Sequence, residues 1–231
     1  MPAAFTTWTV LPHQPIARAA ENLWTVDGRL DDIPRRMTCV RLEDGRIVVH
    51  NAIALDDGEM AELDAWGTVA ALVVPNAYHR MDARIWKDRY PQARVYCPRK
   101  ATGAVTKVVP VDGTLGEAPQ DGTVKIRHLD GLGEAEGVIE VRSRDGVTFV
   151  LNDVVMNSPP ARFPMSVILH PTGRPAVPRI MRWMVMKDAK ALRGELERMA
   201  ATDGLRRVVI SHGTCFVDDG GEGLRAAVAT M

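Results

Sequence analysis

The sequence predicts an α/β fold in which two β-sheets pack face to face and helices cover their outer sides. Two unbroken apolar runs, residues 69–74 and 206–210, have the length and β-branched content of strands buried on both faces. Strands, a helix, a strand and a second helix follow one another in the first half of the chain, and the same order returns in the second half. No linker divides the 231 residues, so we expect a single domain over residues 1–231.

The charge balance and the cysteines limit the classes of partner. Lys and Arg together number 29, as do Asp and Glu, so the net charge is zero. Such a balance gives no support to a nucleic-acid or membrane partner, and it leaves a homo-oligomer open. The three cysteines form no C-x-x-C pair, which favours reduced thiols in a cytoplasmic protein. The sequence shows neither a secretory leader nor an apolar run of the roughly 20 residues that a membrane span needs.

The first half opens with strands. Residues 5–10 and 22–26 have the composition of edge strands, and Asp27-Gly28 is typical of a turn. Residues 37–42 and 46–50 are joined through a short segment that ends in glycine, which predicts a β-hairpin.

A helix, a strand, a helix and a strand are expected next, at residues 57–66, 69–74, 81–89 and 93–97. Apolar residues at helical spacing predict both helices. Pro75 ends the buried strand because a proline cannot donate to a central ladder. Tyr90-Pro91 ends the second helix.

The second half contains a further hairpin, a proline-rich loop and two helices. We expect strands at residues 124–128, 137–142, 147–151 and 206–210, and helices at residues 179–201 and 222–229. The proline-rich loop, residues 157–178, is typical of a lid with little regular structure. Asp188 is expected to break the first of the two helices and to cap its second part.

Polar residues follow three of the expected strands. They are the cluster from Asn76 to Asp82, the pair Asn152-Asp153, and Ser211-His212. Open α/β sheets place their sites at the carboxyl ends of strands, so these loops are the candidate site.

This order of loops resembles the metallo-β-lactamase superfamily, from about the first hairpin onward. The superfamily's first motif, H-x-H-x-D-H, follows a buried strand, as N-A-Y-H-R-M does here. Its glycine-flanked histidine is similar in context to G-E-A-E-G, which contains Glu134. Its bridging Asp matches Asp153, and its last His, in H-G, matches His212. The resemblance implies a four-layer αββα sandwich with a metal site on these loops.

The departures from the motif predict that the usual two-metal site is lost. Asn76, Tyr78, Arg80 and Met81 occupy positions of the first motif, and Glu134 takes the place of the third histidine. Zinc prefers imidazole, thiolate or carboxylate ligands. We therefore expect a divergent protein without a cofactor that binds a small molecule or has no catalytic role.

The residues at the centre of this binding site would be Asp153, His212 and His79. The surrounding contacts to the ligand would come from Asn76, Tyr78, Arg80 and Glu134. We expect His79, Asp153 and His212 to face one cleft, although each could instead be an ordinary loop residue that bonds to the backbone.

A metal-dependent hydrolase is the alternative. His79, Asp82, Asp153 and His212 would then hold one zinc or iron ion. A metal-bound water would attack an ester, thioester, lactone or phosphodiester, with Asp153 or Asp82 as the base.

Overall fold

The computed structural model describes residues 3–31, 33–169 and 171–231, and the chain divides into two compact units. Unit 1 is Met1–Ile126 and unit 2 is Arg127–Met231. Each unit has a hydrophobic core of its own. The single-domain organisation stays a prediction.

Unit 1 is built on a seven-stranded sheet with the strand order β1-β2-β3-β4-β5-β6-β7. Strands β1 to β4 pair in an antiparallel manner, and β4 to β7 pair in parallel. The strands are β1 Ala17–Ala20, β2 Leu23–Leu30, β3 Ile33–Arg41, β4 Arg46–His50, β5 Thr68–Val73, β6 Arg94–Cys97 and β7 Gly113–Thr114.

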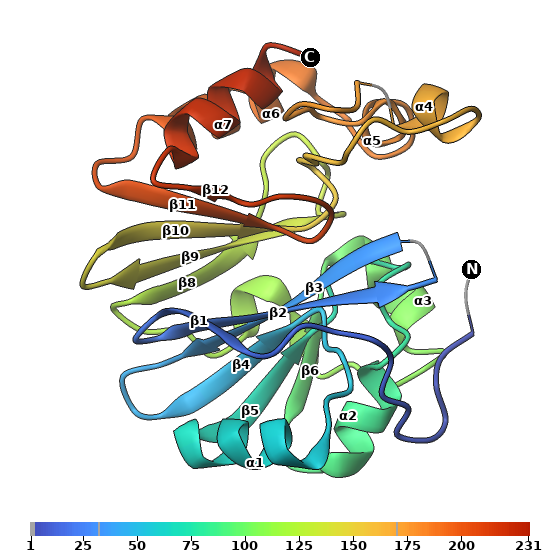
Figure 1. Ribbon diagram of the computed structural model, residues 1–231, viewed down its shortest axis with the longest axis vertical. Coiled ribbons are helices and arrows are strands. Elements are labelled where there is room, and N and C mark those ends of the chain that lie inside the picture. Colours follow the sequence, from blue (N-terminus) through green and yellow to red (C-terminus); the bar gives the residue numbers. More distant parts are fainter. Residues whose placement is uncertain (1–2, 32, 170) are drawn as a thin grey trace. The chain divides into compact units, whose positions relative to one another are not determined.

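Two helices cover one face of this sheet (Figure 1). They are α1, Asp57–Trp66, and α2, Ala83–Arg89. The short helix α3, Thr102–Val105, and the 3-10 turns Arg99–Ala101 and Leu115–Glu117 complete the unit. Trp86 of α2 is fully buried in the core, where the burial of a large aromatic side chain contributes a few kcal/mol.

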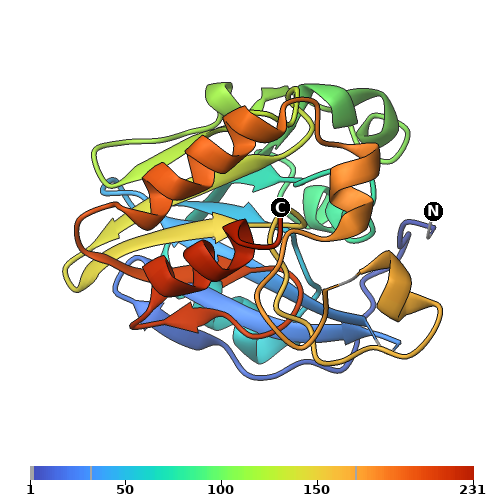
Figure 2. The same ribbon diagram turned by 90° about the horizontal axis from the view of Figure 1, so that it is seen from above.

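Unit 2 carries a five-stranded sheet with the order β12-β11-β10-β9-β8. Its strands are β8 Val124–His128, which spans the division between the units, β9 Gly137–Ser143, β10 Gly146–Leu151, β11 Leu205–Ile210 and β12 Phe216–Val217. Its helices are α4 Met165–Ile168, α5 Arg179–Met184, α6 Ala189–Ala200 and α7 Gly220–Val228. Helices α6 and α7 lie side by side over the sheet (Figure 2).

The two apolar runs are confirmed as interior strands of two different sheets. Strand β5 lies between β4 and β6, and β11 lies between β10 and β12. Both hairpins are confirmed, as β3–β4 and β9–β10. Asp188 caps α6 as expected, because its side chain accepts a hydrogen bond of 2.9 Å from the Ala191 N–H.

Three expectations at the start of the chain are wrong. Residues 22–26 do not form an edge strand, because β2 lies between β1 and β3. Residues 5–10 form no strand; instead Trp8 donates through Nε1 to the Leu55 carbonyl at 2.9 Å, and the Phe5 N–H donates to the Met81 carbonyl at 2.9 Å. Asp27-Gly28 is not a turn, because β2 continues to Leu30. Gly28 lies inside the strand, where a Cβ atom would lie 3.2 Å from Ile53 Cδ1, so close packing explains the glycine.

No disulfide joins Cys39, Cys97 or Cys215 in the described parts of the chain. Among the described residues, no helix combines the length and the apolar character needed to cross a membrane.

A histidine–carboxylate pair ties the N-terminal segment to α1. His13 Nε2 lies 2.6 Å from Glu59 Oε2, and Nδ1 lies 2.8 Å from the Leu11 carbonyl oxygen. Burial lowers the pKa of His13, but the bonds to Glu59 and Leu11 and the charges of Glu59 and Asp56 outweigh it. The pKa is therefore raised above its ordinary value of 6.5.

We predict that the pair stabilises the fold only at the acid end of the neutral range. Because the folded-state pKa is raised, the contribution is fully present below the unfolded-state value of 6.5 and is lost as pH rises through the folded-state value. His13→Asn should lower the free energy of unfolding by up to about 1 kcal/mol below that pH and by less above it.

Denaturant unfolding over pH about 5 to 9 checks this. Glu62→Gln is the control, since Glu62 lies on the same helix and pairs with the exposed Arg18. A difference between wild type and His13→Asn that is constant across this range would mean that the ring does not change its charge there.

Candidate functional site

The loop after β5 is organised by Asn76. Its side chain is 8% exposed, and its Oδ1 atom accepts hydrogen bonds from the backbone N–H groups of Tyr78 at 2.8 Å and His79 at 3.2 Å. An asparagine that bonds to the backbone two residues on is a common turn-forming device. Asn76, which the sequence assigned to a ligand contact, therefore shapes the loop through its side-chain oxygen.

Asn51 orients the imidazole of His79. Asn51 Nδ2 donates to the Arg36 carbonyl at 2.8 Å, which leaves Oδ1 as the acceptor that faces His79 Nδ1 at 3.1 Å. This contact favours the tautomer in which His79 Nδ1 carries the proton. Asn51 has a left-handed backbone with φ of 54°, which brings its side chain to this place. Sequence reasoning missed Asn51; its position directly after β4 was the available signal.

The other residues of this loop lie in different surroundings. Tyr78 is exposed, and Arg80 donates through Nη1 to the Ala104 carbonyl at 2.7 Å. Asp82 is 2% exposed, with Oδ2 2.5 Å from Arg35 Nη1 and Oδ1 bonded to the Ala54 N–H at 3.1 Å.

Both carboxylate oxygens of Asp82 are thus engaged inside unit 1. Burial raises the pKa of the Asp82 carboxyl, against the opposing effects of the Arg35 guanidinium and the Ala54 N–H. We infer that Asp82 organises the loop, and we leave it out of the ligand set proposed below.

Asp153 and His212 meet at one edge of the sheet of unit 2. Strands β10 and β11 are parallel neighbours, with Leu151 opposite Ile210, so their carboxyl ends lie together. His212 Nε2 lies 3.1 Å from Asp153 Oδ1, and the two side chains are 13% and 18% exposed. The sequence predicted both residues, and the structure brings them into contact.

Asn152 is a second residue at this edge; the sequence placed it in a candidate loop but assigned it no role of its own. Its side chain is 1% exposed, and within the described parts of the chain neither Oδ1 nor Nδ2 has a hydrogen-bond partner. Leaving a buried amide unsatisfied costs about 1–3 kcal/mol. The polarity of Asn152 at the end of an otherwise apolar strand was the signal that could have found it.

Hydrogen bonds hold the chain after His212 against Asn157. Gly213 has φ of 95°, and a Cβ atom on it would lie 2.2 Å from the Asn157 carbonyl oxygen. The Thr214 N–H donates to that oxygen at 3.2 Å, and Asn157 Nδ2 donates to the Thr214 carbonyl at 3.0 Å. The glycine in S-H-G is therefore required by both the backbone conformation and the close approach.

Glu134 is exposed in the turn between β8 and β9, with φ of 60°. The convergence of His79 with Asp153 and His212 involves both units and stays a prediction, as do the ligand contacts of Glu134 and of the loop after β5.

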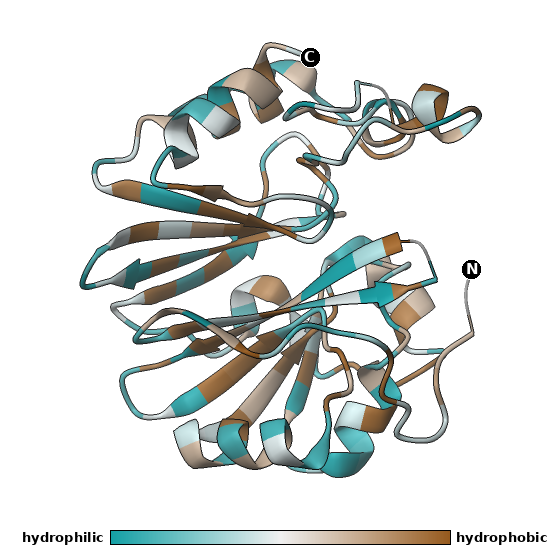
Figure 3. Ribbon diagram, viewed as in Figure 1, coloured by the Kyte–Doolittle hydropathy of each residue, from teal (hydrophilic) through white to brown (hydrophobic). Residues whose placement is uncertain are grey.

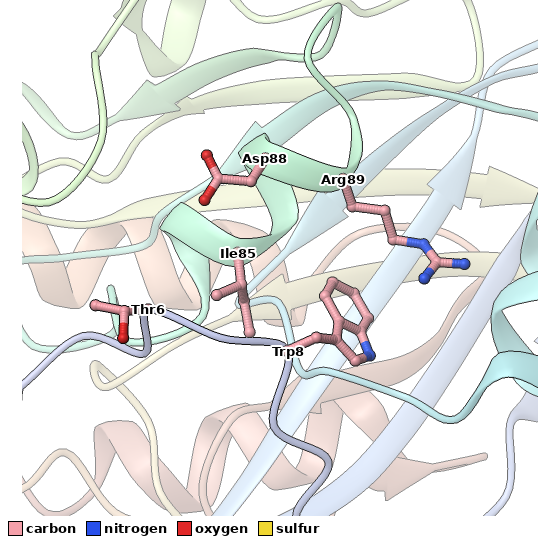
Figure 4. Close-up of a pocket in the computed structure, with 5 residues that line it drawn as sticks. All are labelled: Thr6, Trp8, Ile85, Asp88 and Arg89. Atoms are coloured by element: carbon pink, nitrogen blue, oxygen red, sulfur yellow. The ribbon is translucent and has the colours of Figure 1, made fainter.

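A pocket of about 250 Å³ in unit 1 contains none of the predicted site residues. Its lining consists of Thr6, Trp8, Ile85, Asp88 and Arg89 (Figure 4). The Arg89 guanidinium carbon lies 5.0 Å from the centroid of the Trp8 ring, a cation–π contact that helps to hold the N-terminal segment on α2.

The chain has the metallo-β-lactamase fold, as comparison with solved structures shows. The crystal structure of the DIM-1 metallo-β-lactamase exposed to ceftazidime matches with a TM-score of 0.63 and 14% identity, over 96% of this chain and 99% of that one. The FIM-1 enzyme of Pseudomonas aeruginosa, in a mono-zinc form, matches with a TM-score of 0.61 and 11% identity, over 95% of both chains.

A metallo-β-lactamase from Hirschia baltica matches with a TM-score of 0.58 and 12% identity, over 94% of this chain and 97% of that one. Comparisons with protein-family models and with curated proteins give no match. The predicted fold class, α/β and metallo-β-lactamase-like, is confirmed. At these identities the similarity establishes the fold alone.

We predict that Gly213→Ala disturbs the edge that carries His212. The added Cβ atom would collide with the Asn157 backbone, and φ of 95° is unfavourable for alanine, so the free energy of unfolding should fall by roughly 2 kcal/mol or more. Chemical denaturation measures the change. Gly103→Ala is the matched control, because nothing lies within 4 Å of its Cβ position. Equal stability of the two variants would contradict the close approach.

Proposed function

We propose that this protein keeps the metallo-β-lactamase fold without its usual dinuclear metal centre and binds a small molecule. The observation that carries the proposal is how the side chains at the first-motif positions are bonded and buried. Asn76 Oδ1 bonds to two backbone amides, Arg80 bonds to a backbone carbonyl, and Met81 is buried. These side chains do not fit a centre that needs imidazole or carboxylate ligands.

The polar edge of unit 2 supports binding of a ligand. His212 and Asp153 are half-buried and in contact, which provides a donor and an acceptor in a partly desolvated place. The Asn152 amide, buried directly before Asp153, adds hydrogen-bonding capacity that the described chain does not use. Small-molecule sites combine a few such polar groups with apolar surroundings. His79 is the residue that the sequence assigns to this ligand from unit 1.

The first test is the metal content of protein purified without added metal. We expect no stoichiometric zinc or iron by elemental analysis, because the first-motif positions of unit 1 supply no ordinary ligands. Two ions per chain would contradict the proposal. One ion per chain, lost in both His79→Ala and His212→Ala, would instead support the alternative below.

A mononuclear hydrolase is the alternative, and the orientation of His79 favours it. Metal-binding histidines usually donate through the second ring nitrogen to a carbonyl or carboxylate oxygen, as His79 Nδ1 does to Asn51. His79, Asp153 and His212 would be the ligands. An ion bound there would supply the Lewis acidity that hydrolysis of an ester, thioester, lactone or phosphodiester needs.

The second test uses p-nitrophenyl acetate and bis(p-nitrophenyl) phosphate with added zinc. Our main proposal predicts no turnover of either compound above the uncatalysed rate. The alternative predicts zinc-dependent turnover that falls by about 100-fold or more in His212→Ala, the scale on which lost catalytic groups act. His128→Ala is the control, because His128 ends another strand of the same sheet and has no role in the proposed site.

A further inference from the structure

Residues 157–187, which we call the basic segment, are positively charged, although the net charge of the whole chain is zero. The segment contains no Asp or Glu. Its basic residues are Arg162, Arg174, Arg179, Arg182 and Lys187. In the described parts of the chain neither Arg162 nor Arg174 makes an ion pair, and both are exposed. The segment is therefore a concentrated positive region on a chain whose net charge is zero.

The same segment exposes large apolar side chains. Six of the ten exposed large hydrophobic residues among the described residues lie in it. They are Phe163, Met165, Val167, Ile180, Trp183 and Met184. Phe163 is 82% exposed and Trp183 is 69% exposed, and these are unusually high exposed fractions for aromatic side chains on a protein surface.

This exposure does not result from a segment that is detached from the core. Val177 and Met181 are buried in the core of unit 2. The Val177 N–H donates to Thr230 Oγ1 at 3.1 Å, and Arg182 Nη1 donates to the Thr230 carbonyl at 3.1 Å. The segment is thus anchored from one side, while its aromatic side chains remain in solvent.

The exposed residues belong to neighbouring elements. Helices α4 and α5 contact one another and lie at one end of unit 2 (Figure 1). Hydrophobic residues are visible on α4 in the view coloured by hydropathy (Figure 3). The Arg179 guanidinium carbon lies 5.9 Å from the centroid of the Trp183 ring, so a cation and an aromatic ring are presented together.

We propose that the basic segment docks unit 2 onto the surface of an anionic phospholipid bilayer. Aromatic and aliphatic side chains with arginines among them suit the boundary between headgroups and acyl chains, where rings are half-buried and guanidinium groups reach phosphates. Each basic residue near an anionic leaflet adds to the attraction between the protein and the bilayer. The expectation of no membrane partner rested on the net charge, which averages this region with the rest of the chain.

Charge complementarity decides between this occupant and the other candidates. In a second copy of the chain, packed through the same face, two positive segments would oppose one another and repel. An uncharged apolar ligand would leave the arginines unexplained. An anionic bilayer offers acyl chains to the apolar residues and phosphate groups to the basic residues.

The test is co-sedimentation with vesicles of phosphatidylcholine alone and of phosphatidylcholine mixed with phosphatidylglycerol. The protein should pellet with the mixed vesicles only, and less at high salt. Two double variants, Phe163→Ser/Trp183→Ser and Arg162→Glu/Arg174→Glu, should each weaken binding roughly tenfold or more. Trp183 fluorescence should shift to the blue on binding, and Trp183→Phe should remove that shift.

Matched controls come from unit 1. Val10→Ser/Ile33→Ser removes two exposed apolar residues, and Lys100→Glu/Lys107→Glu reverses two exposed charges. Both controls should bind the mixed vesicles as wild type does, and thermal unfolding should show that every variant is folded.

Three results would overturn the proposal. The first is equal binding to neutral vesicles, or no binding to either kind. The second is a dimer in solution that Phe163→Ser/Trp183→Ser dissociates. The third is displacement of the protein from the vesicles by octanoate below its critical micelle concentration. Such displacement would mean that the basic segment binds a dissolved small ligand.

Discussion

The parallel pairing of β10 with β11 is the interaction on which the candidate site of unit 2 depends. Thr148 to Leu151 lie opposite Arg207 to Ile210, so both strands end at the same level of the sheet. Asp153 and His212 follow these ends by two residues each, and the equal offset brings Nε2 within 3.1 Å of Oδ1. A register shift by one residue would move one strand end by about 3.3 Å relative to the other and so separate the two side chains. The contact is therefore a property of the sheet as much as of the two loops.

The loop after β5 shows how a chain can keep a fold while the ligand positions of a motif take other roles. Asn76 bonds to the amides that follow it, and Arg80 bonds to the carbonyl of Ala104. These bonds maintain the shape of the loop from within the protein. His79 remains oriented by the contact between its Nδ1 atom and Asn51.

The elements defined by apolar pattern could be predicted from the sequence, because burial is what determines them. The runs in β5 and β11 and both hairpins needed no knowledge of distant contacts. The segment at residues 5–10 could not be predicted, because its conformation depends on Trp8 reaching the carbonyl of Leu55. In the site, Asp153 and His212 could be predicted from their position after strands. Asn51 and Asn152 also follow strands, but their importance lies in a hydrogen-bond partner for Asn51, and in a lack of partners among the described residues for Asn152, that only the folded chain reveals.

The Asp82–Arg35 pair shows how unit 1 holds a buried carboxylate in the loop that carries His79. A carboxylate that is 2% exposed needs a cation or hydrogen-bond donors, and Arg35 of β3 with the Ala54 N–H supplies both. The net stabilisation from such a buried pair is small, whereas removal of one partner costs about 3–5 kcal/mol. Arg35 and the Ala54 N–H therefore bond to both oxygens of this carboxylate from within unit 1. Burial still raises the pKa of the Asp82 carboxyl, so these partners offset only part of the cost of burying a carboxylate in the loop that carries His79.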